Sequence, residues 1–150
     1  MKKVKIAIRK KKEAKDLPLP RYLTSGSSGM DLYADVPEGG TLLKPHEIKL
    51  VSCGIYLDIP RGYEAEVRPR SGLALKHGIT LVNTPGTIDS DYRGLISLIM
   101  TNLGKEPFNI KRGDRVAQLV IKEVIKAELA ESEKLGQTQR AEGGFGHTGK

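Results

Sequence analysis

Apolar and polar residues alternate in short runs along most of the chain. The first run covers residues 4–8, and further runs follow at 41–43, 48–59, 63–67, 79–82, 95–102, 108–110 and 116–124. A period of two is typical of half-buried strands, and Gly, Pro, Asn or Asp interrupts most of the gaps between runs. The pattern predicts an all-β sandwich or barrel.

Two segments predict helix instead. Residues 71–77, read SGLALKH, form one to two turns, with Ser71 as the N-cap and Gly78 as the stop. Residues 128–135 are the second candidate helix.

The composition changes at Gly136, where the chain continues as GQTQRAEGGFGHTGK. This stretch has too little apolar surface to order itself. Two interpretations stay open: a frayed tail, or an arm that orders on a ligand or a neighbouring subunit, with glycines approaching an anion and the Phe offering a flat face. We therefore expect one β domain over residues 1–135 and a flexible C-terminal arm over 136–150.

Positive charge is concentrated at the N-terminus. The 150-residue chain has a formal net charge of +7. Residues 1–16 hold eight Lys and Arg against Glu13 and Asp16, so most of the excess lies in this basic strand or arm. A solvated, edge-protecting tail is favoured over a nucleic-acid patch, because the chain has no Trp and only two Phe for base stacking.

Cys53 is the single cysteine, which excludes an intramolecular disulfide and favours a reducing compartment. Its strand-like surroundings predict a small buried residue rather than a reactive thiol. No apolar run approaches the roughly 20 residues that span a membrane, and the charged N-terminus lacks the apolar region of a secretory signal. A cytoplasmic location without membrane contact is expected.

The stretch RPRSGL at 68–73 places an arginine beside a Ser-Gly helix start, which suits phosphate. Its spacing matches no Walker loop, and Ser71 lacks a G-x-S-x-G elbow. The histidines at 46, 77 and 147 have no metal-ligand spacing. The chain instead offers carboxylates, arginines and glycines, which are suited to phosphate-ester or anhydride hydrolysis assisted by Mg²⁺.

The stretch GTIDSDYRG at 86–94 holds two aspartates, Asp89 and Asp91, between glycines. Residues 81–89 predict a strand, a Gly/Pro turn and a second strand. Such a β-hairpin exposes backbone groups that can recognise the edge of a nucleobase. From these residues alone, Asp89 is equally well a turn cap or a carboxylate held for chemistry.

Four further stretches resolve the ambiguity: SGMDLYA at 28–34, RPRSGLA at 68–74, GDRVAQLV at 113–120 and RAEGGFGHTG at 140–149. Together with GTIDSDYRG they resemble, in order, the five motifs of the trimeric dUTPases. The resemblance implies a jelly-roll-like β domain in a homotrimer with active sites at subunit interfaces. It also implies Mg²⁺-dependent hydrolysis of dUTP to dUMP and pyrophosphate, which limits uracil in DNA and supplies dUMP for dTMP synthesis.

The resemblance also implies a role for each matching residue. Asp89 corresponds to the general base that activates the attacking water, and Tyr92 to the residue packed under the deoxyribose. Asp31 corresponds to a carboxylate that holds Mg²⁺ through water, the metal being chelated mainly by the triphosphate. The substrate-binding set comprises Asn83, Gly86, Thr87 and Ile88 for uracil, Arg70, Ser71, Gly72 and Gln118 for phosphate, and Arg140, Phe145, Gly146, His147 and Thr148 in a closing arm. His147 departs from the family, which usually has serine there.

Two other functions remain as alternatives. One is a dCTP deaminase, or a bifunctional deaminase that also cleaves the triphosphate, since these enzymes look like relatives with the same fold. This chain, however, carries the hydrolase aspartate pattern and the GGFG arm. A non-catalytic module that binds nucleotide or nucleic acid is the other, and an intact Asp89 argues against it. Stable nucleic-acid binding is not expected.

Overall fold

The computed structural model describes residues 3–144 and shows a mostly β protein with a single α-helix within that range. The strands are β1 (Ala7–Lys10), β2 (Met30–Tyr33), β3 (Thr41–Leu43), β4 (Ile48–Ser52), β5 (Ile55–Asp58), β6 (Tyr63–Pro69), β7 (Ile79–Leu81), β8 (Gly86–Ile88), β9 (Ser97–Asn102), β10 (Phe108–Ile110) and β11 (Arg115–Glu123). A 3₁₀ turn, η1 (Lys12–Ala14), follows β1, and α1 (Ser71–His77) follows β6. The predicted all-β class with one short helix is confirmed.

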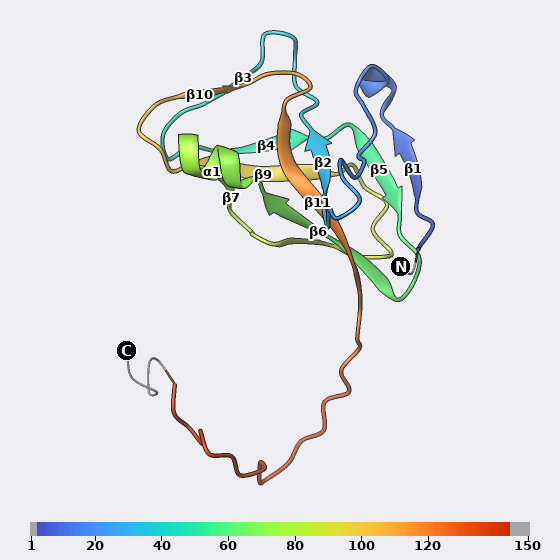
Figure 1. The fold of residues 1–150 in the computed structure, drawn as a ribbon, viewed down its shortest axis with the longest axis vertical. Helices are drawn as coiled ribbons and strands as arrows, with labels where there is room; N and C mark the ends of the chain where they lie inside the picture. Colours follow the sequence, from blue (N-terminus) through green and yellow to red (C-terminus); the bar gives the residue numbers. More distant parts are fainter. Residues whose placement is uncertain (1–2, 145–150) are drawn as a thin grey trace.

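The strands pair antiparallel in sheets of order β2-β11-β6-β8, β4-β9-β7, β1-β5 and β10-β3. Figure 1 shows α1 at one side of the body and the β1-β5 pair at the opposite side. The segment after β11 leaves the body in the same view.

The alternation in β6 and β11 explains how one sheet supplies both core and site. Val67 pairs with Leu119, and both side chains are buried in the core. Because side chains alternate between the two faces of a strand, the next pair, Arg68 and Gln118, points away from that core. Gln118 also pairs with Asp31 on β2, so this outer face gathers the polar groups.

The outer face of the β4-β9-β7 sheet is apolar. Leu50 pairs directly with Ile99, and their residues are 71% and 37% exposed. Val82 donates its backbone N–H to the Ile99 carbonyl and is half-exposed. Exposed apolar stripes are typical of surfaces that contact another protein.

The long run predicted over 48–59 is wrong as one strand. Gly54 has a φ of +65° and separates β4 from β5, which pair with β9 and β1 respectively. A Cβ on Gly54 would lie 2.4 Å from the Ala14 Cβ, so the corner depends on glycine. The neighbouring Cys53 is buried as predicted, and burial, assisted by the Asp35 charge, raises the pKa of its thiol to about 12.

The predicted hairpin over 81–89 is wrong in its pairing, although both strands are present. Strand β7 pairs with β9, whereas β8 pairs with β6, so the intervening turn joins two sheets. The sequence prediction missed strand β2, a run of only four residues, MDLY, whose polar Asp31 is buried beside Leu32.

One of the two predicted helices is present and the other is not. Helix α1 occupies the predicted residues and ends at Gly78 with a φ of +68°, but Ser71 is its first residue and Arg70 takes the N-cap position. The helix predicted over 128–135 is wrong: these residues, all of them described, form no helix, and Leu129 and Leu135 are almost fully exposed. Short helices without a surface to pack against are marginal in water.

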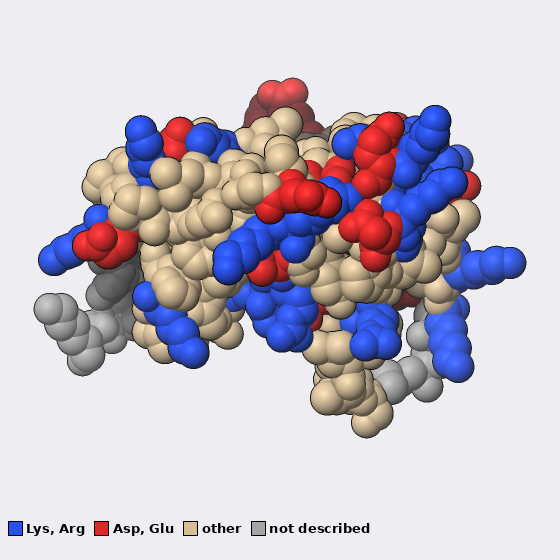
Figure 2. Space-filling view, turned by 90° about the horizontal axis from the view of Figure 1, so that it is seen from above, with Lys and Arg blue, Asp and Glu red and all other residues tan. Residues whose placement is uncertain are grey.

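The basic N-terminal segment is more than a solvated tail. Strand β1 pairs with β5, and Ala14 and Leu17 are buried. Lys11 pairs with Asp35, and Arg112 holds Asp16. On the face in Figure 2, Lys and Arg side chains are interspersed with Asp and Glu.

Candidate active site

The residues that carry candidate chemistry begin at the end of β8. Asp89 directly follows this strand, and its carbonyl accepts a hydrogen bond from the Tyr92 N–H at 3.2 Å. The Tyr92 hydroxyl donates to the Leu95 carbonyl at 3.2 Å, so its ring folds back over Gly94. A Cβ on Gly94 would lie 2.2 Å from the Tyr92 hydroxyl oxygen, which explains the glycine at that position.

A cavity of about 320 Å³, here the Asp89 cavity, lies beside this turn. It brings together six residues predicted for the site: Asn83, Gly86, Thr87, Ile88, Asp89 and Tyr92. Its remaining walls are Leu50, Val67, Leu95, Ile96, Ser97 and Ile99. The cavity therefore joins a carboxylate, an amide and exposed backbone to a largely apolar floor, as a planar heterocycle requires.

Strand β8 comes close to β6 at this cavity because Gly86 has no side chain. A Cβ there would lie 2.6 Å from a Val67 methyl carbon and 3.0 Å from the Asn83 Nδ2. Gly86 thus fixes both the strand spacing and the place of the Asn83 amide.

A second cavity, about 270 Å³ and here the Arg70 cavity, lies on the polar outer face of the β2-β11-β6 sheet. Its walls include Asp31, Arg70, Arg115 and Gln118, and the remaining wall residues are Leu23, Ser27, Ser28 and Gly29. Ser71 and Gly72 follow Arg70 as the first residues of α1. The cavity concentrates two cations and hydroxyl groups, which are the groups that bind phosphate.

Asp31 orders the cations of the Arg70 cavity. Its carboxylate lies 3.1 Å from the Arg70 Nε and 3.2 Å from an Arg115 Nη, and the residue is buried. Arg70 also donates to the Arg115 backbone carbonyl at 3.0 Å. The sequence prediction missed Arg115, although it stands in the GDRVAQLV motif three positions before Gln118.

The two cavities have separate linings, with Asp89 and Tyr92 in one and Arg70 and Gln118 in the other. Three predicted residues, Ser71, Gly72 and Arg140, lie in neither lining. The Arg140 guanidinium donates to the Gly143 carbonyl in the segment after β11. Four predicted site residues, Phe145, Gly146, His147 and Thr148, lie outside the described residues.

Within residues 3–144, no three His, Cys, Asp or Glu side chains are grouped so as to hold a metal ion. A Mg²⁺ ion at Asp31 would need its other ligands from water or from a bound triphosphate, whose oxygens suit this ion. In the same part of the chain, no helix is long and apolar enough to cross a membrane.

The antiparallel β domain has one cavity suited to a heterocycle and a separate cavity lined by arginines. This combination is typical of a nucleotide-binding protein. The chain belongs to the dUTPase family, whose model matches residues 15–149. It is 58% identical to the deoxyuridine 5'-triphosphate nucleotidohydrolase of Thermoanaerobacter sp. (strain X514), over 96% of this chain and 97% of that protein. The protein of the same name from Beijerinckia indica is 53% identical, over 97% and 91% respectively.

Solved structures agree on the fold. The Staphylococcus bacteriophage 80alpha dUTPase with dUPNHPP is similar at a TM-score of 0.85 and 22% identity, covering 97% of this chain and 99% of that one. The dUTPase of phage phi11 of S. aureus, described with a coordinated structural Mg(II) ion, gives a TM-score of 0.77 at 20% identity, with 87% and 98% coverage.

Proposed function

We propose that this protein hydrolyses dUTP to dUMP and pyrophosphate with Mg²⁺. The observation that carries the proposal is the Asp89 cavity, which places a carboxylate beside Asn83, Tyr92 and the β8 backbone. Family membership and the names of close relatives support the same substrate.

Asp89 acts as the general base. It takes a proton from a water molecule whose oxygen attacks the α-phosphorus, and the bond from that phosphorus to the bridging oxygen of the β-phosphate breaks. Arg70 and Gln118 bind the phosphates, assisted by the hydroxyl and N–H groups of Ser71 and Gly72. Asp31 would hold a Mg²⁺ ion through water, and the ion, when bound, would supply positive charge that neutralises the phosphate oxygens.

Selectivity resides in the Asp89 cavity. The Asn83 amide donates and accepts, so together with the backbone of Gly86, Thr87 and Ile88 it matches the N3–H and O4 of uracil. Cytosine presents the opposite pattern and leaves buried polar groups unpaired. Tyr92 packs under the deoxyribose, where a 2′-hydroxyl does not fit.

The complete site is assembled in a homotrimer. The separate cavities support this, since base-binding and phosphate-binding groups from neighbouring subunits can meet across an interface. The exposed Leu50 and Ile99 also line the Asp89 cavity. A second copy of the chain that covers this apolar stripe would therefore lie next to the site. Arg140, Phe145, Gly146, His147 and Thr148 then close over the nucleotide as an arm, with Phe145 on the base. The lone, buried Cys53 supports a cytoplasmic location.

Product analysis tests the proposal. The purified protein is incubated with Mg²⁺ and, separately, dUTP, dCTP, UTP or dTTP. Release of dUMP and pyrophosphate from dUTP alone supports both the chemistry and the selectivity. Ammonia or a uracil product from dCTP would indicate a deaminase, and no product from any of the four would favour a non-catalytic binding module.

A further inference from the structure

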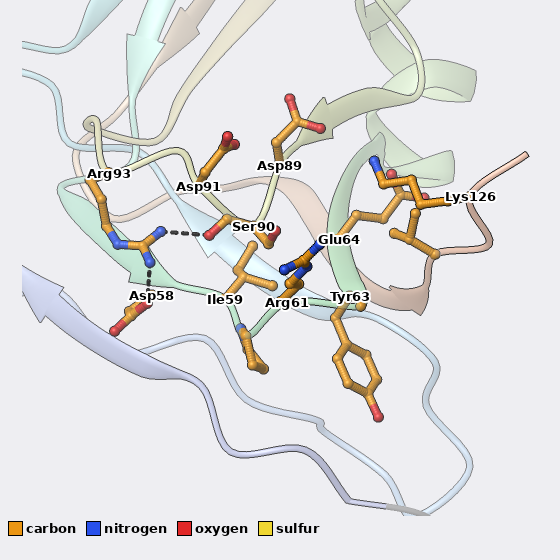
Figure 3. Close-up of a pocket in the computed structure, with 13 residues that line it drawn as sticks. Asp58, Ile59, Arg61, Tyr63, Glu64, Asp89, Ser90, Asp91, Arg93 and Lys126 are labelled. Atoms are coloured by element: carbon orange, nitrogen blue, oxygen red, sulfur yellow. Dashed lines mark hydrogen bonds and ion pairs between the residues drawn. The ribbon is translucent and has the colours of Figure 1, made fainter. Parts of the chain in front are cut away.

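The turn after β8 also borders a third cavity, of about 920 Å³, here the Arg93 cavity (Figure 3). Asp89, Ser90, Asp91 and Arg93 form one wall. The other walls come from Asp58 to Glu64 and from Val124 and Lys126. Asp89 lines this cavity as well as its own, so the segment that carries the proposed base has a second set of neighbours.

Arg93 is the side chain that links this turn to those neighbours. One guanidinium nitrogen donates to the Ser90 carbonyl at 2.7 Å and to the Tyr92 carbonyl at 3.1 Å. The other donates to the Asp58 carboxylate, and Figure 3 shows the guanidinium between Ser90 and Asp58. Asp58 is the last residue of β5 and pairs with Ala7 on β1. A single side chain therefore closes the turn and ties it to another sheet.

The other hydrogen bonds made within residues 89–95 are internal to this segment. The Tyr92 N–H binds the Asp89 carbonyl, and the Tyr92 hydroxyl binds the Leu95 carbonyl. These bonds shape the turn but do not orient it against the body. Orientation from outside comes from β8 at one end, from the backbone hydrogen bonds of Ile96 to Ile55 and Cys53 at the other end, and from the Arg93 contact to Asp58 between them.

The Arg93–Asp58 ion pair contributes little to global stability, because the two side chains are 54% and 61% exposed. The ion pair instead contributes to the geometry of the turn. The planar guanidinium holds two carbonyls and a carboxylate at fixed angles, which a lysine cannot do. The ion pair is thus one of the contacts that orient the turn, and it lies outside the core.

We propose that Arg93 is a positioning residue for Asp89, with Asp58 as its anchor; this inference rests on the proposed function. General-base catalysis depends on the distance between the carboxylate and the attacking water, and small misplacements cost on the order of 10²-fold. The uracil-binding edge is secured separately, because Ile88 and Gly86 pair with Ala65 and Val67. Loss of Arg93 therefore lowers kcat and leaves the KM for dUTP nearly unchanged.

The test compares Arg93→Gln, Arg93→Lys, Asp58→Asn and the Arg93→Gln/Asp58→Asn double variant. Arg61→Gln is the matched control, since Arg61 lines the same cavity. We expect Arg93→Gln to lower kcat about 10- to 100-fold and to change KM less than about threefold. Arg93→Lys recovers part of the loss, the double variant is no worse than Arg93→Gln, and Arg61→Gln retains the parent kcat.

Hydrogen exchange over residues 86–96 gives a readout independent of turnover. Arg93→Gln should accelerate exchange at the Tyr92 amide, which is bonded to Asp89, while the thermal midpoint stays within about 2 °C. Unchanged exchange, or a kcat within twofold of the parent enzyme, would overturn the inference and leave the proposed function intact. A parent protein that does not hydrolyse dUTP removes the proposed function instead, and the exchange result alone then decides whether Arg93 orders the turn.

Discussion

The Asp31 carboxylate lies 3.1 Å from the Arg70 Nε, a buried acid against a half-buried guanidinium at the edge of the Arg70 cavity. Its second oxygen faces Arg115. Each carboxylate oxygen has a further lone pair, so these contacts leave room for a Mg²⁺-bound water. Asp31 is thus suited to position two cations and to hold the metal shell at the same time.

Replacing this carboxylate separates the two roles. We expect Asp31→Asn to raise the KM for dUTP about tenfold at saturating Mg²⁺, because a charge-assisted bond contributes about 1.5–3 kcal/mol. The Mg²⁺ concentration for half-maximal activity should also rise. Steady-state kinetics with both ligands varied measure this, with the exposed Glu38→Gln as control. An unchanged KM with a raised Mg²⁺ requirement would restrict Asp31 to metal binding.

Asp89→Asn keeps the size of the side chain and removes the base. The variant should bind a non-hydrolysable dUTP analogue normally and turn over about 10²–10⁴-fold more slowly. Asp91→Asn, two positions further along the same turn, is the matched control and should stay near parent activity. Titration calorimetry and single-turnover assays separate binding from chemistry. Near-normal turnover in Asp89→Asn would refute the assignment.

Gly94→Ala tests whether the Tyr92 ring sets sugar selectivity. The added Cβ would lie 2.2 Å from the Tyr92 hydroxyl, so the ring must leave its place against Leu95. We expect the ratio of kcat/KM for dUTP over UTP to fall at least tenfold, with the global fold retained. Gly39→Ala is the control, since a Cβ there meets nothing within 4 Å. A preserved ratio would assign 2′-hydroxyl rejection to another residue.

Truncation after Leu135 tests the arm. In residues 136–144 the hydrogen bonds of Arg140 and Ala141 are made to Gly143 and Thr138, inside the same segment. The truncated protein should therefore keep its fold and oligomeric state while losing most dUTP hydrolysis. Analytical ultracentrifugation and product release measure the two properties. Full activity after truncation would mean that the arm has no part in catalysis.

Much of the fold could be predicted because most strands bury one face. The pairs Val67–Leu119 and Leu50–Ile99 show why alternation locates strands but not sheets: one pair is buried and the other exposed, yet both are apolar. Pairing partners depend on long-range register. The hairpin predicted between β7 and β8 is therefore wrong, although its residues were correctly selected.

For the candidate site too, the sequence predicts which residues take part but not which long-range contacts they make. The motif residues Asp89, Asn83 and Tyr92 do share one cavity. Arg115 and Arg93 stand inside the motifs, but only the structure shows that they contact Asp31 and Asp58. Such contacts join segments far apart in the chain, and local sequence carries no signal for them.

One of the contacts between the N-terminal segment and the body is the ion pair of Lys11 with the buried carboxylate of Asp35. Its side chain is 3% exposed and accepts from Arg112 at 2.7 Å, from Lys11 at 3.1 Å and from Ser52 at 3.1 Å. Burial opposes its ionisation, yet the hydrogen bonds from Arg112, Lys11 and Ser52 hold the pKa of Asp35 below its usual value. The folded state therefore binds this proton less readily than the unfolded chain does.

It follows that the stability contributed by the ionised Asp35 is complete above the unfolded pKa of about 3.9 and is lost as the pH falls through the lower folded pKa. We expect Asp35→Asn to lower the free energy of unfolding by about 2 kcal/mol at pH 7, because Arg112 loses a buried charged partner. The difference from the parent protein should shrink below about pH 4. Urea unfolding at one protein concentration from pH 7 to pH 3 measures this, with Asp16→Asn, whose carboxylate is exposed, as the weaker control. A difference that stays constant over this range would show that the charge of Asp35 is not its source.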